Sequence, residues 1–240
     1  MAKKGRTKHL KRIAAAKAIP VTNRKATTWM LNPSPGPHAK KHAIPLGVLL
    51  RDILAVVKTA REAKKILSKR LVEVDGRVRT DIRFPVGLMD VISFNKLNKH
   101  YRMLVDWKGR LVPMEIGKEE AASKIAKVVG KRTIRGGKLT ITLHDGKNMV
   151  ADNHVKVGDS VVLGLPKGEL KQHLKSQKGA RCLVSEGKHA GNIVKLKDIV
   201  IRKGSKPSEA VVESDGTEFI TVAQYLFVVD DDFKIKGKAG

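Results

Sequence analysis

Cations without acidic neighbours are the side chains in this sequence that are best placed to do chemistry. Residues 1–43 contain 11 Lys and Arg and no Asp or Glu. A second group has the three- and four-residue spacing that places side chains on one face of a helix: Arg61, Lys64, Lys65 and Lys69. Unopposed cations at this density attract a polyanion, and nucleic-acid phosphate is the leading candidate. The predicted chemistry is therefore charge neutralisation, with no bond made or broken.

The charge of the whole chain supports this interpretation. Its 240 residues include 49 Lys and Arg against 23 Asp and Glu, which gives a formal net charge of +26 at pH 7. The excess is uneven, because residues 93–178 carry 18 cations against 8 acids whereas residues 179–229 carry 7 against 6. An anionic membrane is the second candidate partner, but it requires an amphipathic helix with bulky apolar residues, which the sequence lacks. We expect no membrane span and no secretion signal, and the single cysteine fits a reducing compartment.

No enzymatic site is apparent in the sequence. Gly130-Lys131 and Gly137-Lys138 lack the glycine spacing and the Ser or Thr of a Walker loop. A nucleophile elbow and the helix motif of zinc proteases are also absent. Cys182 lies in a predicted strand and is interpreted as a small core residue. We therefore predict a protein that is not an enzyme, with no cofactor, no metal site and no small-molecule substrate.

Residues 44–92 are predicted to form a compact module. An apolar run from Leu46 to Val57 is followed by a capping box, Thr59-Ala60-Arg61-Glu62, which starts a helix running to about Arg70. The apolar face of this helix is expected to consist of Ala60, Ala63, Ile66 and Leu67. The next run is typical of a hairpin with an Asp75-Gly76 turn. The module therefore combines two short helices with a hairpin.

These residues resemble a known RNA-binding family. Thr59 to Ala63, followed by Val72 to Val78 and by Gly87 with Asp90-Val91-Ile92, is similar to the alpha-L RNA-binding motif. Three further segments flank it in one order: His9-Leu10-Lys11-Arg12, Pro33 to His38, and Gly187-Lys188-His189-Ala190-Gly191. The combination resembles archaeal and eukaryotic small-subunit ribosomal proteins of the S4e family over nearly the whole chain. The last segment also resembles a KOW motif, which implies an SH3-like barrel that binds RNA or ribosomal protein.

We predict an α+β multidomain fold with five segments. They are a basic, proline-containing N-terminal extension (1–43), the alpha-L module (44–92), a central strand-rich domain (93–178), a KOW SH3-like β-barrel (179–229) and a mobile tail (230–240). The extension is expected to be disordered alone, with one helical stretch over residues 8–17. The central domain is expected to contain a hairpin over 101–112, a helix over 119–129, a strand over 139–143 and a strand pair over 155–163. The barrel is expected from six short strand-like runs, at 180–185, 192–196, 199–202, 210–213, 218–221 and 225–229.

The candidate RNA-binding residues are cations together with two histidines and one tryptophan. Trp29 is included because a lone aromatic ring in a cationic arm stacks on a base or docks on a neighbour. The full set is Lys3, Lys4, Arg6, Lys8, His9, Lys11, Arg12, Lys17, Arg24, Lys25, Trp29, Lys40, Lys41, Arg61, Lys64, Lys65, Lys69, Arg132, Arg135, Lys138, Lys188 and His189. Plainer alternatives stay open. In these alternatives, the extension over residues 1–43 is only a solubilising tail, and the cations from Arg61 to Lys69 form a solvated helix face. The cations around Gly136-Gly137 then belong to an ordinary turn and are solvated.

Three functions are compatible with these patterns. The resemblance implies a structural constituent of the small ribosomal subunit that binds and stabilises folded rRNA, with neighbouring ribosomal proteins as partners, in the cytoplasm and on the ribosome. An RNA-modifying enzyme would share the alpha-L module but needs a catalytic Asp, Cys or cofactor loop. A KOW-type transcription or chromatin factor would bind polymerase or duplex DNA. The uneven basic charge and the missing catalytic groups favour the first.

Overall fold

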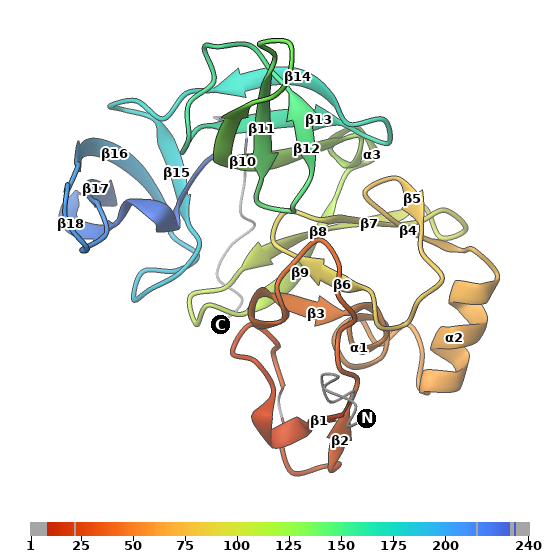
Figure 1. Ribbon diagram of the computed structural model, residues 1–240. Coiled ribbons are helices and arrows are strands. Elements are labelled where there is room, and N and C mark those ends of the chain that lie inside the picture. The colour runs from red at the N-terminus through yellow and green to blue at the C-terminus, as the bar shows by residue number, and fades with distance from the viewer. Residues whose placement is uncertain (1–8, 22, 215, 231–232, 234–240) are drawn as a thin grey trace, which may run out of the picture.

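The computed structural model describes residues 9–21, 23–214, 216–230 and 233. Within them the chain forms three five-stranded antiparallel sheets and two short two-stranded ladders, with few helices (Figure 1). The architecture is therefore multidomain and made mostly of strands. Among the described residues, no helix has the length and apolar character needed to cross a membrane.

The N-terminal segment forms a short ladder. Its elements are β1 (Leu10–Lys11), the 3-10 turn η1 (Arg12–Ala14), β2 (Trp29–Met30) and the 3-10 turn η2 (Lys40–His42). β1 pairs antiparallel with β2, so Lys11 lies opposite Trp29. The helix expected over residues 8–17 is wrong for the described part of that range, because this pairing holds the chain extended.

Small apolar side chains fix this segment against the following module. Ala15, Ala18 and Ile19 are buried in the same core cluster as Leu46. The Leu111 N–H donates to the Ala18 carbonyl at 2.8 Å. Within the full chain, burial of these side chains offsets the cost of ordering the backbone. The expectation that the extension is disordered alone stays a prediction.

The next module contains the predicted helices and hairpin. Its elements are β3 (Ala43–Pro45), α1 (Leu46–Val48), the π-helical turn η3 (Leu49–Ile53), α2 (Ala60–Ser68), β4 (Val72–Val74), β5 (Arg77–Val78), β6 (Pro85–Gly87), β7 (Val91–Phe94), β8 (Lys99–Val105) and β9 (Leu111–Ile116). The capping box is confirmed, because Thr59 Oγ1 accepts from the Glu62 N–H at 3.2 Å while the Glu62 carboxylate accepts from the Thr59 N–H. On the apolar face of α2, Ala63 and Leu67 are fully buried.

One sheet unites the hairpin with the strands that follow it. Its order is β5-β4-β7-β8-β9, and β3 pairs separately with β6. The predicted hairpin turn is confirmed, with left-handed φ values of +53° at Asp75 and +68° at Gly76. The expected domain boundary between residues 92 and 93 falls inside β7, which pairs with β8. The other proposed boundaries remain predictions.

The central sheet differs from expectation in one long element. It contains β10 (Ser123–Thr133), β11 (Leu139–Leu143), β12 (Asn148–Val150), β13 (Ser160–Gly164) and β14 (Glu169–Leu174), in the order β12-β11-β10-β13-β14, and is preceded by α3 (Lys118–Ala121). The helix expected over 119–129 is wrong beyond α3, because β10 pairs with β11 and β13. Ile125 and Val128 of β10 are buried in two different core clusters. The strand pair expected over 155–163 is also wrong in its first half, where the chain turns before β13.

The C-terminal unit is a sheet with the order β18-β17-β16-β15-β19. Its strands are β15 (Arg181–Val184), β16 (Ile193–Val200), β17 (Glu209–Ser214), β18 (Thr217–Val222) and β19 (Leu226–Val228), with the 3-10 turn η4 (Ala223–Tyr225) before β19. Two expected runs, 192–196 and 199–202, form the single strand β16, which has a bulge between Leu196 and Asp198. Phe233, expected in a mobile tail, is instead buried in a core cluster with Phe227. Residues 231–232 and 234–240 of that tail lie outside the described residues.

Candidate nucleic-acid interface

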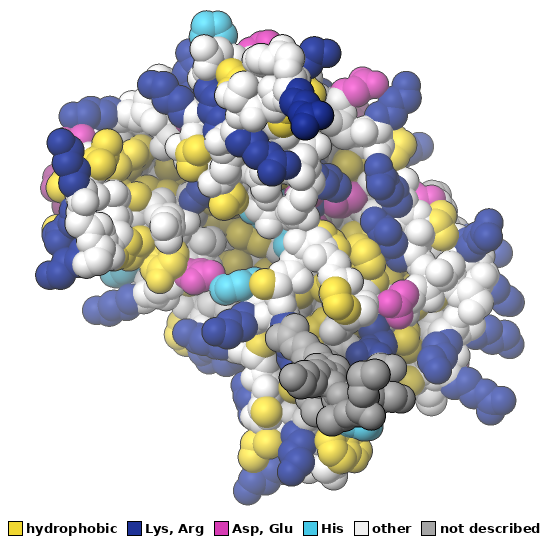
Figure 2. Space-filling view, viewed as in Figure 1, with side chains coloured by type: hydrophobic (Ala, Val, Ile, Leu, Met, Phe, Trp, Pro, Cys, Tyr) yellow, Lys and Arg dark blue, Asp and Glu magenta, His cyan; other side chains and the backbone are white. Residues whose placement is uncertain are grey.

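The cations predicted on α2 project into solvent on the side opposite the core. Arg61, Lys64, Lys65 and Lys69 are all exposed. In the part of the chain that the structure describes, none of these four side chains takes part in an ion pair. Figure 2 shows Lys and Arg side chains projecting at the edge of the molecule where α2 lies. The sequence prediction that these four residues share one exposed face is therefore correct.

The acid nearest to this stripe is already engaged. The Glu62 carboxylate accepts hydrogen bonds from the Lys58 N–H at 2.9 Å and the Thr59 N–H at 3.4 Å. The bond from Lys58 is the main reason that the pKa of Glu62 is lowered. Because Glu62 caps the helix, it does not form an ion pair with Lys65 or Lys69, and the stripe keeps its charge for an external anion.

The ladder of the N-terminal segment presents an aromatic pair. Trp29 is 56% exposed, and the His9 ring lies 5.5 Å from it at an interplanar angle of 54°. Lys11 pairs with Trp29 across the ladder, which places a cation beside the indole. Such a surface combines a face for base stacking with a charge for phosphate. Of the other predicted cations of this segment, Lys40 is half-buried and three are exposed: Lys17, Lys25 and Lys41.

Two predicted arginines of the segment act within the chain. Arg12 Nε donates to the Asn23 carbonyl at 2.7 Å, and Arg24 Nη1 donates to the carbonyls of Ile13 and Ala15 at 3.0 and 3.2 Å. Both guanidinium groups therefore stabilise the backbone conformation of the N-terminal segment. Four further candidates lie outside the described residues: Lys3, Lys4, Arg6 and Lys8.

The connection between β10 and β11 forms a basic turn. Arg132, Arg135 and Lys138 are exposed, and the Ile134 N–H donates to the Lys138 carbonyl at 2.9 Å to close the loop. Gly136 and Gly137 have left-handed φ values of +83° and +70°, with open space where a Cβ would lie. The backbone at this turn is accessible to a phosphate group.

The loop from Gly187 to Gly191 behaves differently from expectation at one position. Lys188 is exposed, but the His189 ring stacks on Phe219 with centroids 3.9 Å apart, so it packs within the C-terminal unit. A Cβ on Gly191 would lie 2.9 Å from the carbonyl oxygen of Val105. This glycine therefore permits the C-terminal loop to approach the end of β8, and the role of His189 as an RNA ligand remains a prediction.

Comparison with known proteins identifies the family. A model of the S4 domain matches residues 50–92, a model of the RS4NT domain matches residues 4–41, and a model of ribosomal family S4e matches residues 97–170. The small ribosomal subunit protein eS4 of Methanosphaera stadtmanae is 43% identical over 97% of this chain and 96% of its own length. This chain belongs to the S4e family of ribosomal proteins. The eS4 protein of Methanocaldococcus jannaschii is 40% identical over 97% of this chain and 98% of its own length.

A solved structure agrees with this assignment. The crystal structure of the 30S ribosomal protein S4e from Thermoplasma acidophilum matches with a TM-score of 0.69 and 30% identity, covering 80% of this chain and 96% of that one. As a member of a family of structural ribosomal proteins, this S4e chain is not an enzyme. Its single cysteine, Cys182, is buried, and burial raises the pKa of the thiol to about 12. Cys182 packs in a core cluster with Val184 and Val194, as expected of a small core residue.

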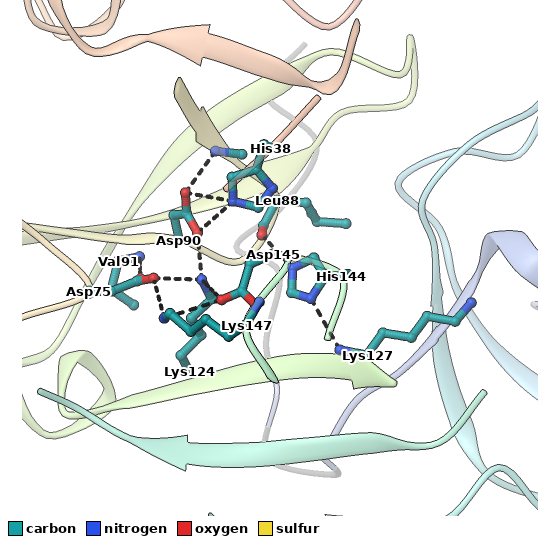
Figure 3. A network of polar contacts seen from close by, with 11 residues as sticks. His38, Asp75, Leu88, Asp90, Val91, Lys124, Lys127, His144, Asp145 and Lys147 are labelled. Carbon is teal, nitrogen blue, oxygen red and sulfur yellow. Dashed lines mark hydrogen bonds and ion pairs between the residues drawn. The ribbon is translucent and has the colours of Figure 1, made fainter. Parts of the chain in front are cut away.

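A buried ionic cluster in the S4e chain was not predicted from the sequence (Figure 3). Lys124 is fully buried, and its Nζ lies 2.7 Å from Asp75, 2.6 Å from Asp90 and 3.2 Å from Asp145. Lys147 reaches Asp75 and Asp145 from the rim at 3.3 and 3.2 Å. Burial alone would lower the pKa of Lys124, but the three carboxylates raise it above its usual value. Asp75 and Asp90 belong to connections of the sheet β5-β4-β7-β8-β9, so the cluster joins that sheet to the central sheet.

Two histidines extend this cluster to other parts of the chain. His38 Nε2 lies 2.9 Å from Asp90 and fixes the end of the N-terminal segment. His144 bonds through Nε2 to the Leu88 carbonyl at 3.1 Å. Lys127 Nζ donates to the carbonyls of Gln224 and Leu226, both at 2.7 Å, so the central sheet is also tied to the C-terminal unit. The contacts position the basic surfaces relative to one another.

Mild acid is expected to destabilise the chain through His144. Its Nδ1 accepts from the Lys127 N–H at 3.2 Å, so the neutral ring is the form that satisfies both nitrogens. Burial, helped by Lys124, lowers the pKa of His144 from 6.5 to about 4. The unfolded chain binds this proton near pH 6.5, so the free energy of unfolding should fall by up to about 3 kcal/mol between pH 7 and 4.

Urea unfolding at pH 7, 5.5 and 4.5 checks this prediction. His144→Gln keeps a donor and an acceptor but does not titrate, so its stability should depend less on pH over this range. Equal pH dependence of the variant and the unaltered chain would show that His144 does not supply the effect. Below about pH 5 both should lose further stability, because Lys124 opposes burial and lowers the pKa of Asp90 and Asp145.

Proposed function

We propose that this S4e chain is a structural constituent of the small ribosomal subunit that binds and stabilises folded rRNA without catalysis. The observation that carries the proposal is the α2 stripe, whose exposed cations Arg61, Lys64, Lys65 and Lys69 have no intramolecular ion pair in the described chain. Its relatives bear the name of small ribosomal subunit proteins, and its residues 50–92 match an S4 domain. Its partners are then small-subunit rRNA and neighbouring ribosomal proteins, in the cytoplasm and on the ribosome.

We also propose that the C-terminal unit is a KOW-type SH3-like barrel. Five antiparallel strands and a bulge in β16 support this proposal, because bulges bend strands where a sheet curls. The loop from Gly187 to Gly191 supplies the glycines of the motif. In the α+β arrangement that we propose, the alpha-L module lies between the N-terminal segment on one side and the central domain with the C-terminal unit on the other.

The proposed mode of binding is neutralisation of phosphates by several separate surfaces. The α2 stripe, the Trp29 ladder and the turn around Gly136 each present cations to solvent. Phosphate contacts fix orientation, while RNA shape and unpaired bases supply specificity. Affinity for an rRNA fragment should therefore fall steeply with salt, with a log–log slope of several units, since each neutralised phosphate contributes roughly 0.7–0.9. Filter binding from about 50 to 300 mM KCl measures the slope, and a flat titration would contradict the proposal.

Trp29→Ala should weaken rRNA binding by about 1–3 kcal/mol, because stacking of one base on an aromatic ring contributes that much. Trp107→Ala is the matched control. Trp107 is also 56% exposed, but Lys108 Nζ lies 4.3 Å from its ring centroid and occupies one face. Binding at constant salt distinguishes the two variants. If both lose the same affinity, or neither does, Trp29 is not a stacking platform.

A further inference from the structure

A cavity lies where four parts of the chain meet. The N-terminal segment contributes Ala18 and His42, β9 contributes Leu111, β10 contributes Val129, and the turn η4 of the C-terminal unit contributes Gln224. Its volume is about 680 Å³, which lies within the range of about 300–1,000 Å³ that is typical of sites for small organic ligands. Figure 2 shows a hollow near the centre of this face, with hydrophobic side chains at its floor.

Apolar side chains form much of the lining. Val129 of β10 and Val157 of the turn before β13 are 57% and 58% exposed. Val105 and Leu111, from β8 and β9, are buried. Water covers the two exposed valines in the free chain, and its displacement by an apolar surface is favourable. The lining therefore suits the face of a flat ring.

Two polar side chains offer hydrogen bonds in the same cavity. Lys127 Nζ donates to the carbonyls of Gln224 and Leu226, both at 2.7 Å, which fixes the ammonium group and uses two of its three N–H groups. Burial lowers the pKa of Lys127 to about 8, so the group keeps most of its charge at pH 7. The Gln224 amide has no hydrogen-bond partner in the part of the chain that the structure describes. The cavity therefore presents free donors and an acceptor, which the polar edge of a nucleobase can match.

The acids at the cavity are already engaged. Glu186 is the one acid among the described residues that line it, and its carboxylate lies 3.1 Å from His42 Nδ1. Asp106, which follows the lining residue Val105, accepts from the Trp107 N–H at 2.7 Å. These contacts leave the cations nearby without an acidic partner.

Free positive charge borders the cavity. Lys17 Nζ would lie 3.8 Å from a Cβ on Gly109, which lines the cavity. Four exposed lysines, each next to or two positions from a lining residue, form no ion pair within the described chain: Lys17, Lys41, Lys156 and Lys188. Cations thus surround a mostly apolar interior. A nucleotide has the same division, because its negative phosphate is separate from its flat, uncharged base.

We propose that this cavity binds one unpaired nucleobase of the rRNA. The base inserts between the apolar side chains, its polar edge meets Lys127 and Gln224, and its flanking phosphates lie near the bordering lysines. Such a contact selects an unpaired nucleotide, which neutralisation of phosphates alone cannot do. This inference rests on the proposed binding of rRNA.

Val157→Trp, which places a large ring in the cavity, should weaken binding of small-subunit rRNA by the full chain about tenfold at constant salt. Gln224→Ala leaves the cavity open and should weaken it about fivefold, since one hydrogen bond to the base is lost. The matched control is Ile220→Trp, because Ile220 is 65% exposed on β18 and does not line the cavity. The control should bind like the unaltered chain, and urea unfolding should show the same midpoint for all four proteins.

Chemical probing identifies the base. Protein-free small-subunit rRNA is mixed with each full-length chain and treated with dimethyl sulfate and carbodiimide, which modify the pairing edges of unpaired bases. We expect at least one base to be protected by the unaltered chain and by Ile220→Trp, and to become reactive with Val157→Trp. A mixture of the four nucleoside monophosphates, titrated into the free chain, tests the cavity for free nucleotides.

Three results overturn the inference and leave the proposed function intact. The first is rRNA affinity and base protection that neither Val157→Trp nor Gln224→Ala alters. The second is a Val157→Trp chain that binds protein-free rRNA normally but is excluded from particles assembled with the other subunit proteins, since the occupant is then a protein. The third is tight binding of free nucleotides that Val157→Trp abolishes without any effect on rRNA. An unaltered chain that does not bind rRNA contradicts the proposed function, and this inference with it.

Discussion

Lys124→Met is expected to lower the free energy of unfolding by about 3–5 kcal/mol, the usual cost of removing one partner from a buried ionic cluster. Lys124 is fully buried and lies within 3.2 Å of carboxylates from Asp75, Asp90 and Asp145. Without its ammonium group these carboxylates lose their shared counter-charge in a region from which water is excluded. Urea unfolding followed by circular dichroism at pH 7 measures the change.

Lys147→Met provides the matched control in the same cluster. Lys147 contacts Asp75 and Asp145 at 3.3 and 3.2 Å, but its side chain is 39% exposed. Solvent screens an exposed pair, so this variant should lose less than about 1 kcal/mol. Equal stability of Lys124→Met and the unaltered chain would show that the cluster does not hold the two sheets together.

The double substitution Lys64→Ala and Lys65→Ala is expected to reduce the log–log salt slope of rRNA binding by about one to two units. Both side chains are exposed on α2, and the buried face of the helix, which includes Ala63 and Leu67, is untouched. Alanine is the best helix former, so the fold should be preserved. The slope is obtained from filter binding of an rRNA fragment over a range of KCl concentrations.

Removal of two cations elsewhere separates a local contact from loss of net charge. Lys203→Ala with Lys206→Ala changes the net charge equally, in an exposed loop of the C-terminal unit. This variant should keep the slope of the unaltered chain. If the α2 variant also keeps that slope, the stripe is only a solvated helix face.

The elements predicted correctly from the sequence are those fixed by local interactions. The capping box at Thr59 and the Asp75-Gly76 turn each depend on residues within a few positions of one another. The helix predicted over 119–129 failed because Ala122, Ile125, Ala126 and Val129 have helical spacing, while the pairing partners that make β10 a strand come from residues 139–143 and 160–164. Long-range pairing of this kind overrides local propensity.

The exposed part of the candidate site was predictable, but its buried support was not. The stripe on α2 was identified from the spacing of its cations. Residues three or four positions apart lie on one face of a helix, so no long-range contact is needed to bring them together. The ionic cluster joins residues that lie 21 to 49 positions from Lys124. Asp75 was explained as a turn residue, which it also is. The only local indication of the cluster was the position of Lys124, which directly precedes the buried residues Ile125 and Ala126 in β10.

Sedimentation with the small ribosomal subunit tests the central claim most directly. The purified full-length chain is mixed with small-subunit rRNA and the remaining subunit proteins at low ionic strength, and the particles are separated on a sucrose gradient. We predict that the chain travels with the small-subunit particle and is released as the salt concentration rises. A chain that stays at the top of the gradient at low salt, while the particle forms without it, would contradict the account.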